Sequence, residues 1–162
     1  MDPTWICFFC HKSSHYRGLG DLFGPYYVPT KIVKPVKSVS ACESPKKGGK
    51  RRRKSSLSEP ETQSAVIPAP PQVGDKTEIW FHEDCYIWIP CTHLVGGRLV
   101  GMEEAVSQCQ DLSCAVCHVT GASVGCTVHS CHHAAHLNCA LEDGWSLDMD
   151  KFAVKCSKCL KT

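Results

Sequence analysis

The sequence predicts a small zinc-stabilised α+β domain with little regular secondary structure. Two observations indicate this fold class. First, the chain of 162 residues contains thirteen cysteines and nine histidines, and most of the cysteines stand in pairs with a short gap. Second, the gaps between pairs are too short to build a conventional core, so bound metal has to supply much of the stability.

Between positions 114 and 159, seven cysteines and His136 form four pairs, in the order of four cysteines, one histidine and three cysteines. A two-residue gap lets both side chains of a pair face one ion, so a pair supplies half of a tetrahedral zinc site. The order of the pairs suggests a cross-brace, in which the first and third pairs share one zinc and the second and fourth share another. The predicted ligand sets are Cys114, Cys117, His136 and Cys139, and Cys126, Cys131, Cys156 and Cys159.

A third site is predicted from two pairs that lie far apart in the chain. Cys7-Phe-Phe-Cys10 is flanked by apolar residues that suit the core of a zinc knuckle, and His82-Glu-Asp-Cys85 follows seventy-one residues later. The second pair has the same spacing as His136-Leu-Asn-Cys139, which favours ligation over a surface histidine. We therefore expect three zinc ions, the third held by Cys7, Cys10, His82 and Cys85.

A disulfide framework is the alternative use of so many cysteines. The odd count, the histidines at ligand spacing and the lack of an apolar leader after Met1 favour zinc in a reducing compartment. Three cysteines fit no pair: we expect Cys42 to be a free thiol, and Cys91 and Cys109 to be buried thiols. The histidines at 132 and 133 stand at the wrong place in the pattern and are not expected to be ligands.

Taken in order, the first segment between the ligands is residues 18–28, which mixes turn-forming residues with aromatics. We expect its apolar side chains to pack against the knuckle, namely Leu22, Phe23, Tyr26 and Tyr27. Residues 94–101 predict a short hairpin that turns at Gly96-Gly97. Residues 102–110 have helical character, with two glutamates in the first turn, where the helix dipole favours them.

In the cross-brace, residues 124–128 and 134–137 suit two short strands that cross the zinc sites. Trp145 and Leu147 follow in a stretch that can pack on the core. Few residues separate the helix at 102–110 from Cys114, so the knuckle and the cross-brace are expected to form one compact unit.

Residues 38–76 are rich in Ser, Pro, Lys, Glu and Gln and show no hydrophobic period, so we expect a disordered insertion. The predicted organisation is a zinc knuckle from residues 1–37 and 77–111, the insertion at 38–76, and the cross-braced finger at 112–162. A basic run in the insertion is typical of a nuclear import signal or a nucleic-acid patch, with a solubilising charge run as the alternative. It consists of Lys46, Lys47, Lys50, Arg51, Arg52, Arg53 and Lys54.

Charge and apolar patterning narrow the function further. The net charge of +2 conceals an uneven distribution of charge along the chain. Basic side chains are concentrated in the run described above, whereas residues 77–162 contain ten acidic and five basic side chains. No run of about 18 apolar residues occurs, so no membrane span is predicted. Each predicted zinc site has four protein ligands, whereas a catalytic site keeps one position open for water. With no catalytic triad or phosphate loop either, we expect neither enzymatic activity nor a small-molecule substrate.

The pattern closely resembles the extended PHD finger, in which a Cys-x-x-Cys…His-x-x-Cys knuckle precedes a PHD finger with seven cysteines and one histidine in the order found here. Residues 18–27, 80–85, 95–101 and 122–126 resemble one branch of that family, that of the retinoic-acid-induced regulator and the stromelysin-promoter-binding protein. The resemblance covers residues 5–37 and 77–160 and matches all twelve ligand positions. It implies a chromatin module of a nuclear transcriptional regulator that contacts nucleosomes, histone tails, DNA or other chromatin proteins.

Two other functions stay open at this point. A RING-type ubiquitin ligase also uses a zinc cross-brace, but such fingers place the third and fourth ligands about one residue apart, whereas four residues separate Cys126 from Cys131. A purely protein-docking zinc domain is the other alternative. Methyl-lysine-reading PHD fingers carry a tryptophan two residues before the seventh ligand, and here that position is Val154. Since a cage needs a ring face for the cation, we expect no trimethyl-lysine readout.

Overall fold

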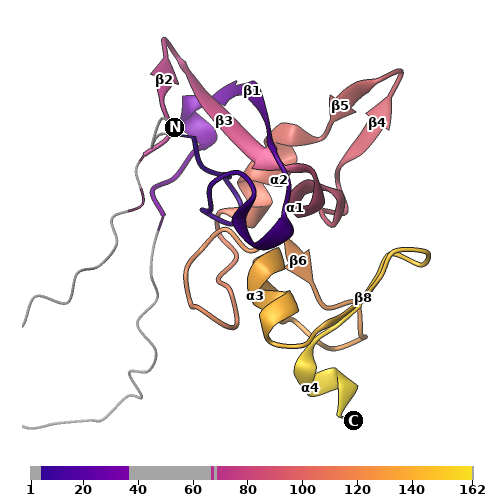
Figure 1. Ribbon diagram of the computed structural model, residues 1–162. Helices are drawn as coiled ribbons and strands as arrows, with labels where there is room; N and C mark the ends of the chain where they lie inside the picture. The colour runs from indigo at the N-terminus through magenta and orange to yellow at the C-terminus, as the bar shows by residue number, and fades with distance from the viewer. Residues whose placement is uncertain (1–4, 37–66, 68, 162) are drawn as a thin grey trace, which may run out of the picture.

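The computed structural model describes residues 5–36, 67 and 69–161, and its secondary structure is sparse (Figure 1). The predicted basic run, Cys42 and most of the predicted insertion lie outside the described residues. The elements in chain order are the 3₁₀ helix η1 (Tyr16–Gly18), β1 (Leu22–Pro29), the 3₁₀ helix η2 (Thr30–Ile32), β2 (Gln72–Val73), β3 (Lys76–His82), α1 (Glu83–Ile87), β4 (His93–Val95), β5 (Arg98–Val100), α2 (Met102–Cys109), β6 (Val124–Gly125), β7 (Ala134–Ala135), α3 (Leu137–Glu142), β8 (Ser146–Asp148), β9 (Ala153–Lys155) and α4 (Ser157–Leu160).

An antiparallel three-stranded sheet in the order β1-β3-β2 builds the knuckle part. Its inner face carries Val28 and Ile79, which pack with Val106 of α2 in a small apolar cluster. The pairing of β1 with β3 is interrupted between Phe23 and Tyr26. Side chains alternate between the two faces of a strand, so the neighbours of Val28 along β1 and of Ile79 along β3 point to the outer face of the sheet.

This alternation corrects the expectation that all four apolar side chains of residues 18–28 pack against the knuckle. Leu22 and Tyr26 pack against the core as predicted, but Phe23 and Tyr27 are each 48% exposed and do not cover the knuckle. A second correction concerns the insertion, which was expected to run to residue 76. The structure places β2 and the turn after it within that range, and Gln72 and Val73 pair with the start of β3.

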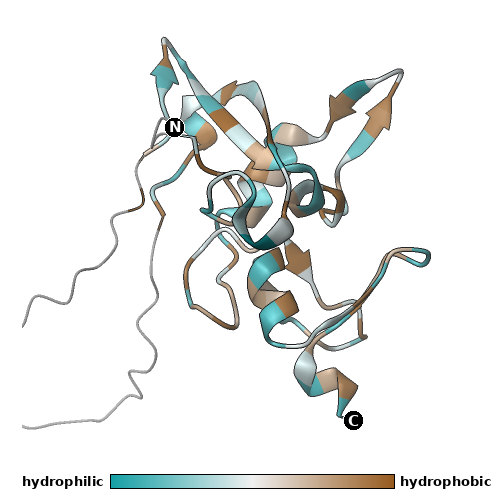
Figure 2. Cartoon of the chain, viewed as in Figure 1, coloured by the Kyte–Doolittle hydropathy of each residue, from teal (hydrophilic) through white to brown (hydrophobic). Residues whose placement is uncertain are grey.

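The hairpin predicted for residues 94–101 is confirmed as β4 and β5, which pair from His93 with Val100 to Val95 with Arg98. Its turn residues Gly96 and Gly97 have φ of 55° and 76°, the left-handed values that a two-residue turn between twisted strands requires. The predicted helix at 102–110 is α2, which ends one residue earlier at Cys109 and has both glutamates in its first turn. In Figure 2 the hairpin stands away from the rest of the chain, and both of its strands carry hydrophobic as well as hydrophilic residues.

The cross-brace part contains two small two-stranded sheets, β6 with β7 and β8 with β9. The first pair was predicted at 124–128 and 134–137 but is shorter at both positions, because Cys126 and His136 turn away into metal clusters. The second pair was not predicted. Trp145 is buried and Leu147 packs partly against the core, as expected.

A single hydrophobic cluster joins the knuckle to the cross-brace, which confirms the expectation of one compact unit. Its buried members include Phe9 and Phe81 from the first part and Val124 and Trp145 from the second. The ring of Trp88 contacts Phe152 of the β8–β9 hairpin at 5.8 Å between centroids. Within the described chain, no helix combines the length and the apolar character that are needed to cross a bilayer.

Candidate metal centres

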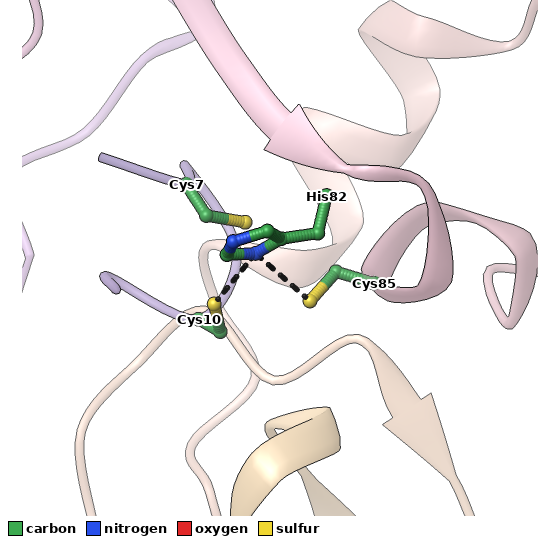
Figure 3. A group of neighbouring side chains, drawn as sticks. All are labelled: Cys7, Cys10, His82 and Cys85. Carbon is green, nitrogen blue, oxygen red and sulfur yellow. Dashed lines mark hydrogen bonds between the residues drawn. The ribbon is translucent and has the colours of Figure 1, made fainter. Parts of the chain in front are cut away.

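The structure gathers the twelve predicted ligands into three clusters, and in each cluster all ligand atoms lie within 4.8 Å of one another. The clusters are Cys7, Cys10, His82 and Cys85; Cys114, Cys117, His136 and Cys139; and Cys126, Cys131, Cys156 and Cys159. Figure 3 shows the first, in which three cysteine sulfurs converge on one imidazole from two distant segments. Four nitrogen and sulfur donors at this separation suit tetrahedral Zn²⁺. The cysteines within the described part are all free thiols, so the disulfide alternative fails there.

One local scaffold presents the second half of every cluster. The third ligand is the residue before a short helix, where His82, His136 and Cys156 have extended φ and ψ. The fourth ligand is the third residue of that helix. A strand leads into the third ligand, and the first helical turn brings the fourth ligand back beside it. This is the physical reason for the repeated two-residue gap.

The same backbone hydrogen bond joins the two halves of every site. The amide of the residue after the first ligand donates to the carbonyl two residues before the third ligand. These bonds run from Phe8 to Trp80 at 2.7 Å, from Ala115 to Ala134 at 2.8 Å, and from Thr127 to Val154 at 2.8 Å. Val154 is thus a buried residue of strand β9, and its carbonyl accepts the hydrogen bond that joins the two halves of the third cluster.

The knuckle turn of the first cluster is repeated in the second. The amide of His11 donates to the carbonyl of Cys7 at 2.9 Å, and the amide of His118 donates to the carbonyl of Cys114 at 2.9 Å. Both histidines have left-handed backbone, with φ of 58° and 60°. The two sites that combine three cysteines with one histidine are therefore built in the same way, although seventy-one residues interrupt the first and eighteen interrupt the second.

Each ligand histidine is oriented by a carbonyl six residues after the first cysteine of its site. His82 Nε2 lies 3.0 Å from the carbonyl of Ser13, and His136 Nε2 lies 3.3 Å from that of Thr120. A proton on Nε2 is donated to that carbonyl, so the lone pair of Nδ1 faces the sulfurs, with Cys10 3.4 Å away in the first site and Cys117 3.2 Å away in the second. A second partner of this kind orients most metal-binding histidines.

Thiol acidity in the first two clusters is uneven. Burial raises the pKa of Cys7, but hydrogen bonds with Cys10, Cys85 and His82 outweigh it and hold that pKa well below its usual value. The hydrogen bond with Cys139 lowers the pKa of Cys114 to about 2, and the same interaction raises the pKa of Cys139. One thiolate is thus stabilised by neighbours that keep their protons.

The third cluster has the same asymmetry in a more open setting. Burial opposes ionisation of Cys156, but hydrogen bonds from Cys159 and Cys131 lower its pKa to about 7. The hydrogen bond with Cys156 raises the pKa of Cys159 to about 12. Several adjacent thiolates repel one another, so full deprotonation of any of the three clusters needs a dication at its centre.

Some residues around the clusters carry no spacing signal and were missed in the sequence. His133 lies outside the four-cysteine set, as expected, yet its Nδ1 is 3.2 Å from Cys131 Sγ and its Nε2 is 3.2 Å from Lys158 Nζ. The contact between the rings of His11 and His136 was not foreseen either. The two unpaired cysteines of the described chain belong to no cluster, and the one at 109 is buried as expected whereas the one at 91 is only partly so.

The fold and the clusters define a cross-braced zinc finger with a fused zinc knuckle. Comparison with known families agrees: residues 71–162 match the model of the PHD-zinc-finger like domain. The chain belongs to this family, and three zinc ions fit its three clusters. The resemblance to an extended PHD finger is thereby confirmed.

Relatives are found among much longer proteins. Human retinoic acid-induced protein 1 is 32% identical over 127 residues, which cover 78% of this chain and 7% of that protein. The uncharacterized protein CG5098 of Drosophila melanogaster is 29% identical over 219 residues, covering 96% of this chain and 18% of that protein. The histone-lysine N-methyltransferase trithorax of the same organism is 34% identical over 64 residues, 39% of this chain and 2% of that protein. The chain therefore spans less than a fifth of each of these relatives.

Proposed function

We propose that this chain is a non-catalytic, zinc-dependent module of a nuclear transcriptional regulator, and that it contacts chromatin through nucleosomes, histone tails or DNA. The observation that carries the proposal is the set of three four-ligand clusters in a PHD-like finger. A relative named as a histone-lysine N-methyltransferase supports the assignment to chromatin. The twelve clustered residues are the zinc ligands in this proposal.

The domain organisation follows from the same sites. Residues 1–37 and 77–111 form the knuckle part, 112–162 form the PHD finger, and the insertion lies between the two pieces of the knuckle. Because Gln72 and Val73 of β2 pair with β3, residues 72–76 at the end of the insertion join the knuckle sheet in this proposal. The insertion contributes the basic run at 46–54, which serves DNA contact or nuclear import.

A structural role for the metals is favoured by the donor count. Catalytic zinc keeps one position for water or substrate, whereas each cluster here offers four protein donors to one ion. Residues of the first cluster are also buried throughout, which hinders the approach of a substrate. Zinc then acts by holding the knuckle and the finger in shape, and recognition falls to the protein surface.

The finger offers an edge for a histone tail. Within the described residues, β6 pairs with β7 on one side only. Of residues 124–128, the amide of Thr127 already donates to the carbonyl of Val154, so an extended peptide can add as a further strand beside the part that β6 occupies. The basic run would supply sequence-independent attraction to phosphate. Two separable contributions to nucleosome binding follow, one from the finger and one from the insertion.

The test compares the zinc-loaded chain on free DNA, histone tail peptides and whole nucleosomes at two salt concentrations. We expect nucleosomes to bind more tightly than free DNA of the same length, and the difference to persist at the higher salt. Equal affinity for both ligands would reduce the function to DNA attraction, and no binding to any of them would overturn the proposal. Ubiquitin transfer by the chain with a conjugating enzyme would instead establish the RING-type alternative.

A further inference from the structure

Three aromatic side chains stand on the outer side of the knuckle sheet and take no part in the metal sites. They are Trp5, Tyr27 and Trp80, and the carboxylate of Glu78 accepts hydrogen bonds from the last two; we call these four residues the aromatic ledge. Trp5 is 51% exposed and Tyr27 is 48% exposed, whereas the remaining tryptophans, at 88 and 145, are buried. A cluster of large aromatic rings left in water indicates a binding surface more often than a structural one.

The position of Trp80 is set by the strand opposite. A Cβ atom at Gly24 would lie 2.7 Å from a ring carbon of Trp80, so only glycine at that position leaves room for the indole. The ring of Trp5 stacks on Trp80 with 4.8 Å between centroids and 19° between planes. The segment that carries Trp5 is held by the bond from the amide of Phe8 to the carbonyl of Trp80. Contacts of the backbone at Gly24 and Phe8 therefore hold the two stacked rings in position.

The carboxylate of Glu78 is oriented by two donors of the ledge. Tyr27 and Glu78 are direct partners in the pairing of β1 with β3, so both side chains emerge on the same face. Trp80 Nε1 donates to one carboxylate oxygen at 2.8 Å, and the Tyr27 hydroxyl donates to the other at 3.5 Å. Each oxygen retains a further acceptor site. In the described part of the chain, the ion pairs involve other carboxylates and leave Glu78 without a cation.

A ring face attracts a cation, and a carboxylate attracts it further while it repels phosphate. The complementary group is therefore cationic and belongs to a peptide rather than to a nucleic acid. Of the cationic groups, guanidinium is flat enough to stack on an indole and can also donate two parallel hydrogen bonds to a carboxylate. A trimethylammonium group has no proton to donate to Glu78.

We propose that the aromatic ledge binds the arginine side chain of a basic partner peptide, with the guanidinium against the exposed indole of Trp5 and paired with Glu78. The ledge is already assembled by its own hydrogen bonds and stacking, so little ordering is needed on binding. The proposal goes beyond contact with chromatin, because it names the chemical group recognised and a surface distinct from the β6 edge, and it can be tested without a nucleosome.

The test follows the indole N–H signals of the zinc-loaded chain by NMR while a pentapeptide with one central arginine is added. Matched peptides carry lysine, trimethyl-lysine or citrulline, which has the shape of arginine without its charge. We expect the signals of Trp5 and Trp80 to shift and saturate with the arginine peptide, and those of Trp88 and Trp145 to stay in place. The citrulline peptide should bind at least about five-fold more weakly.

Two substitutions separate the ledge from general charge effects. Glu78→Gln should weaken binding of the arginine peptide about five-fold, whereas Glu103→Gln, an exposed carboxylate in α2, should leave it unchanged. Unchanged signals of Trp88 and Trp145 verify that each variant is folded, and Trp5→Phe retains a ring if Trp5→Ala disturbs the stack. Equal binding of citrulline, tighter binding of trimethyl-lysine, or no effect of Glu78→Gln would each overturn the proposal.

Discussion

His11 of the knuckle and His136 of the PHD finger point at the same backbone oxygen, the carbonyl of Thr120. Their Nε2 atoms lie 2.9 Å and 3.3 Å from it, and the two rings meet edge to face at 5.6 Å. His136 belongs to the second metal cluster, and His11 directly follows a residue of the first. The two clusters are thus coupled through one peptide group, which joins the knuckle to the finger.

Gly121, the residue after this carbonyl, should be intolerant of a side chain. Its φ is +109°, and an added Cβ would lie 2.7 Å from His11 Nε2 and 2.8 Å from the carbonyl oxygen of Phe9. We expect Gly121→Ala to lower the free energy of unfolding by about 1–3 kcal/mol, because it combines backbone strain with overpacking. Urea unfolding of the zinc-loaded chain measures the loss.

Gly125→Ala is the matched control, because its backbone does not have positive φ and a Cβ there would meet nothing within 4 Å. This variant should change the free energy of unfolding by less than about 1 kcal/mol. An equal loss in the two variants would mean that the contact with His11 does not couple the two parts.

The metal clusters could be predicted from sequence because their geometry is local. An extended residue followed by one helical turn places two ligands side by side, and this unit leaves a readable gap in the chain, as at His82 and Cys85. The order of the pairs then determines which halves meet. The two adjacent glycines likewise identified the hairpin turn at Gly96-Gly97, where positive φ is required at both positions.

The three-stranded sheet could not be predicted in the same way. The pairing of β1 with β3 joins residues about fifty positions apart, and the interruption between Phe23 and Tyr26 breaks the alternation that would mark a strand. The role of the Ser13 and Thr120 carbonyls as acceptors for the ligand histidines could not be predicted either, because every residue type carries a backbone carbonyl. Tertiary contacts, rather than local preference, decide these features.

Metal content should be three zinc ions per chain, as the three clusters require. Cys7→Ser should reduce it to two, because the first cluster loses a thiolate, whereas Cys91→Ser should keep all three since Cys91 belongs to no cluster. Elemental analysis of dialysed protein measures both. A content of three in the Cys7 variant would show that the first cluster does not hold zinc through that residue.

Removal of one ligand from the third cluster should unfold the finger. Structural zinc contributes roughly 10–16 kcal/mol in finger peptides, far more than a small domain can spare. Cys156→Ser should therefore expose buried Trp145 and make residues after 112 sensitive to protease. Tryptophan fluorescence and limited proteolysis give the measurement, with Lys155→Ala, at the exposed residue before Cys156, as the neighbouring control. Native fluorescence and resistance in the Cys156 variant would contradict a structural role.

Stability should fall at alkaline pH because of Cys109. Burial, with a smaller contribution from Cys91, raises the pKa of Cys109 to about 12 from its usual 9.0. The folded chain keeps this proton between these values while the unfolded chain loses it, so stability falls as pH rises through that window. By pH 10 the loss is about 1.4 kcal/mol. The difference in unfolding free energy between the native chain and Cys109→Ala should shrink by that amount from pH 7.5 to 10, and a constant difference would refute the assignment.

Nucleosome binding should lose most of its salt dependence when residues 46–54 are deleted. The run holds seven basic side chains, whereas residues 77–162 have ten acidic and five basic ones. If about six of the seven meet phosphates, the logarithm of affinity should fall with the logarithm of salt concentration at a slope of roughly −5.

The deletion should flatten that slope yet leave a weaker preference for nucleosomes over free DNA, because the β6 edge is unchanged. Replacing the seven basic residues by glutamine at constant length controls for the shortened chain, and titrations at three or more salt concentrations supply the slopes. An unchanged affinity and slope in both variants would assign the run to nuclear import alone, and the folded part would then account for all of the binding.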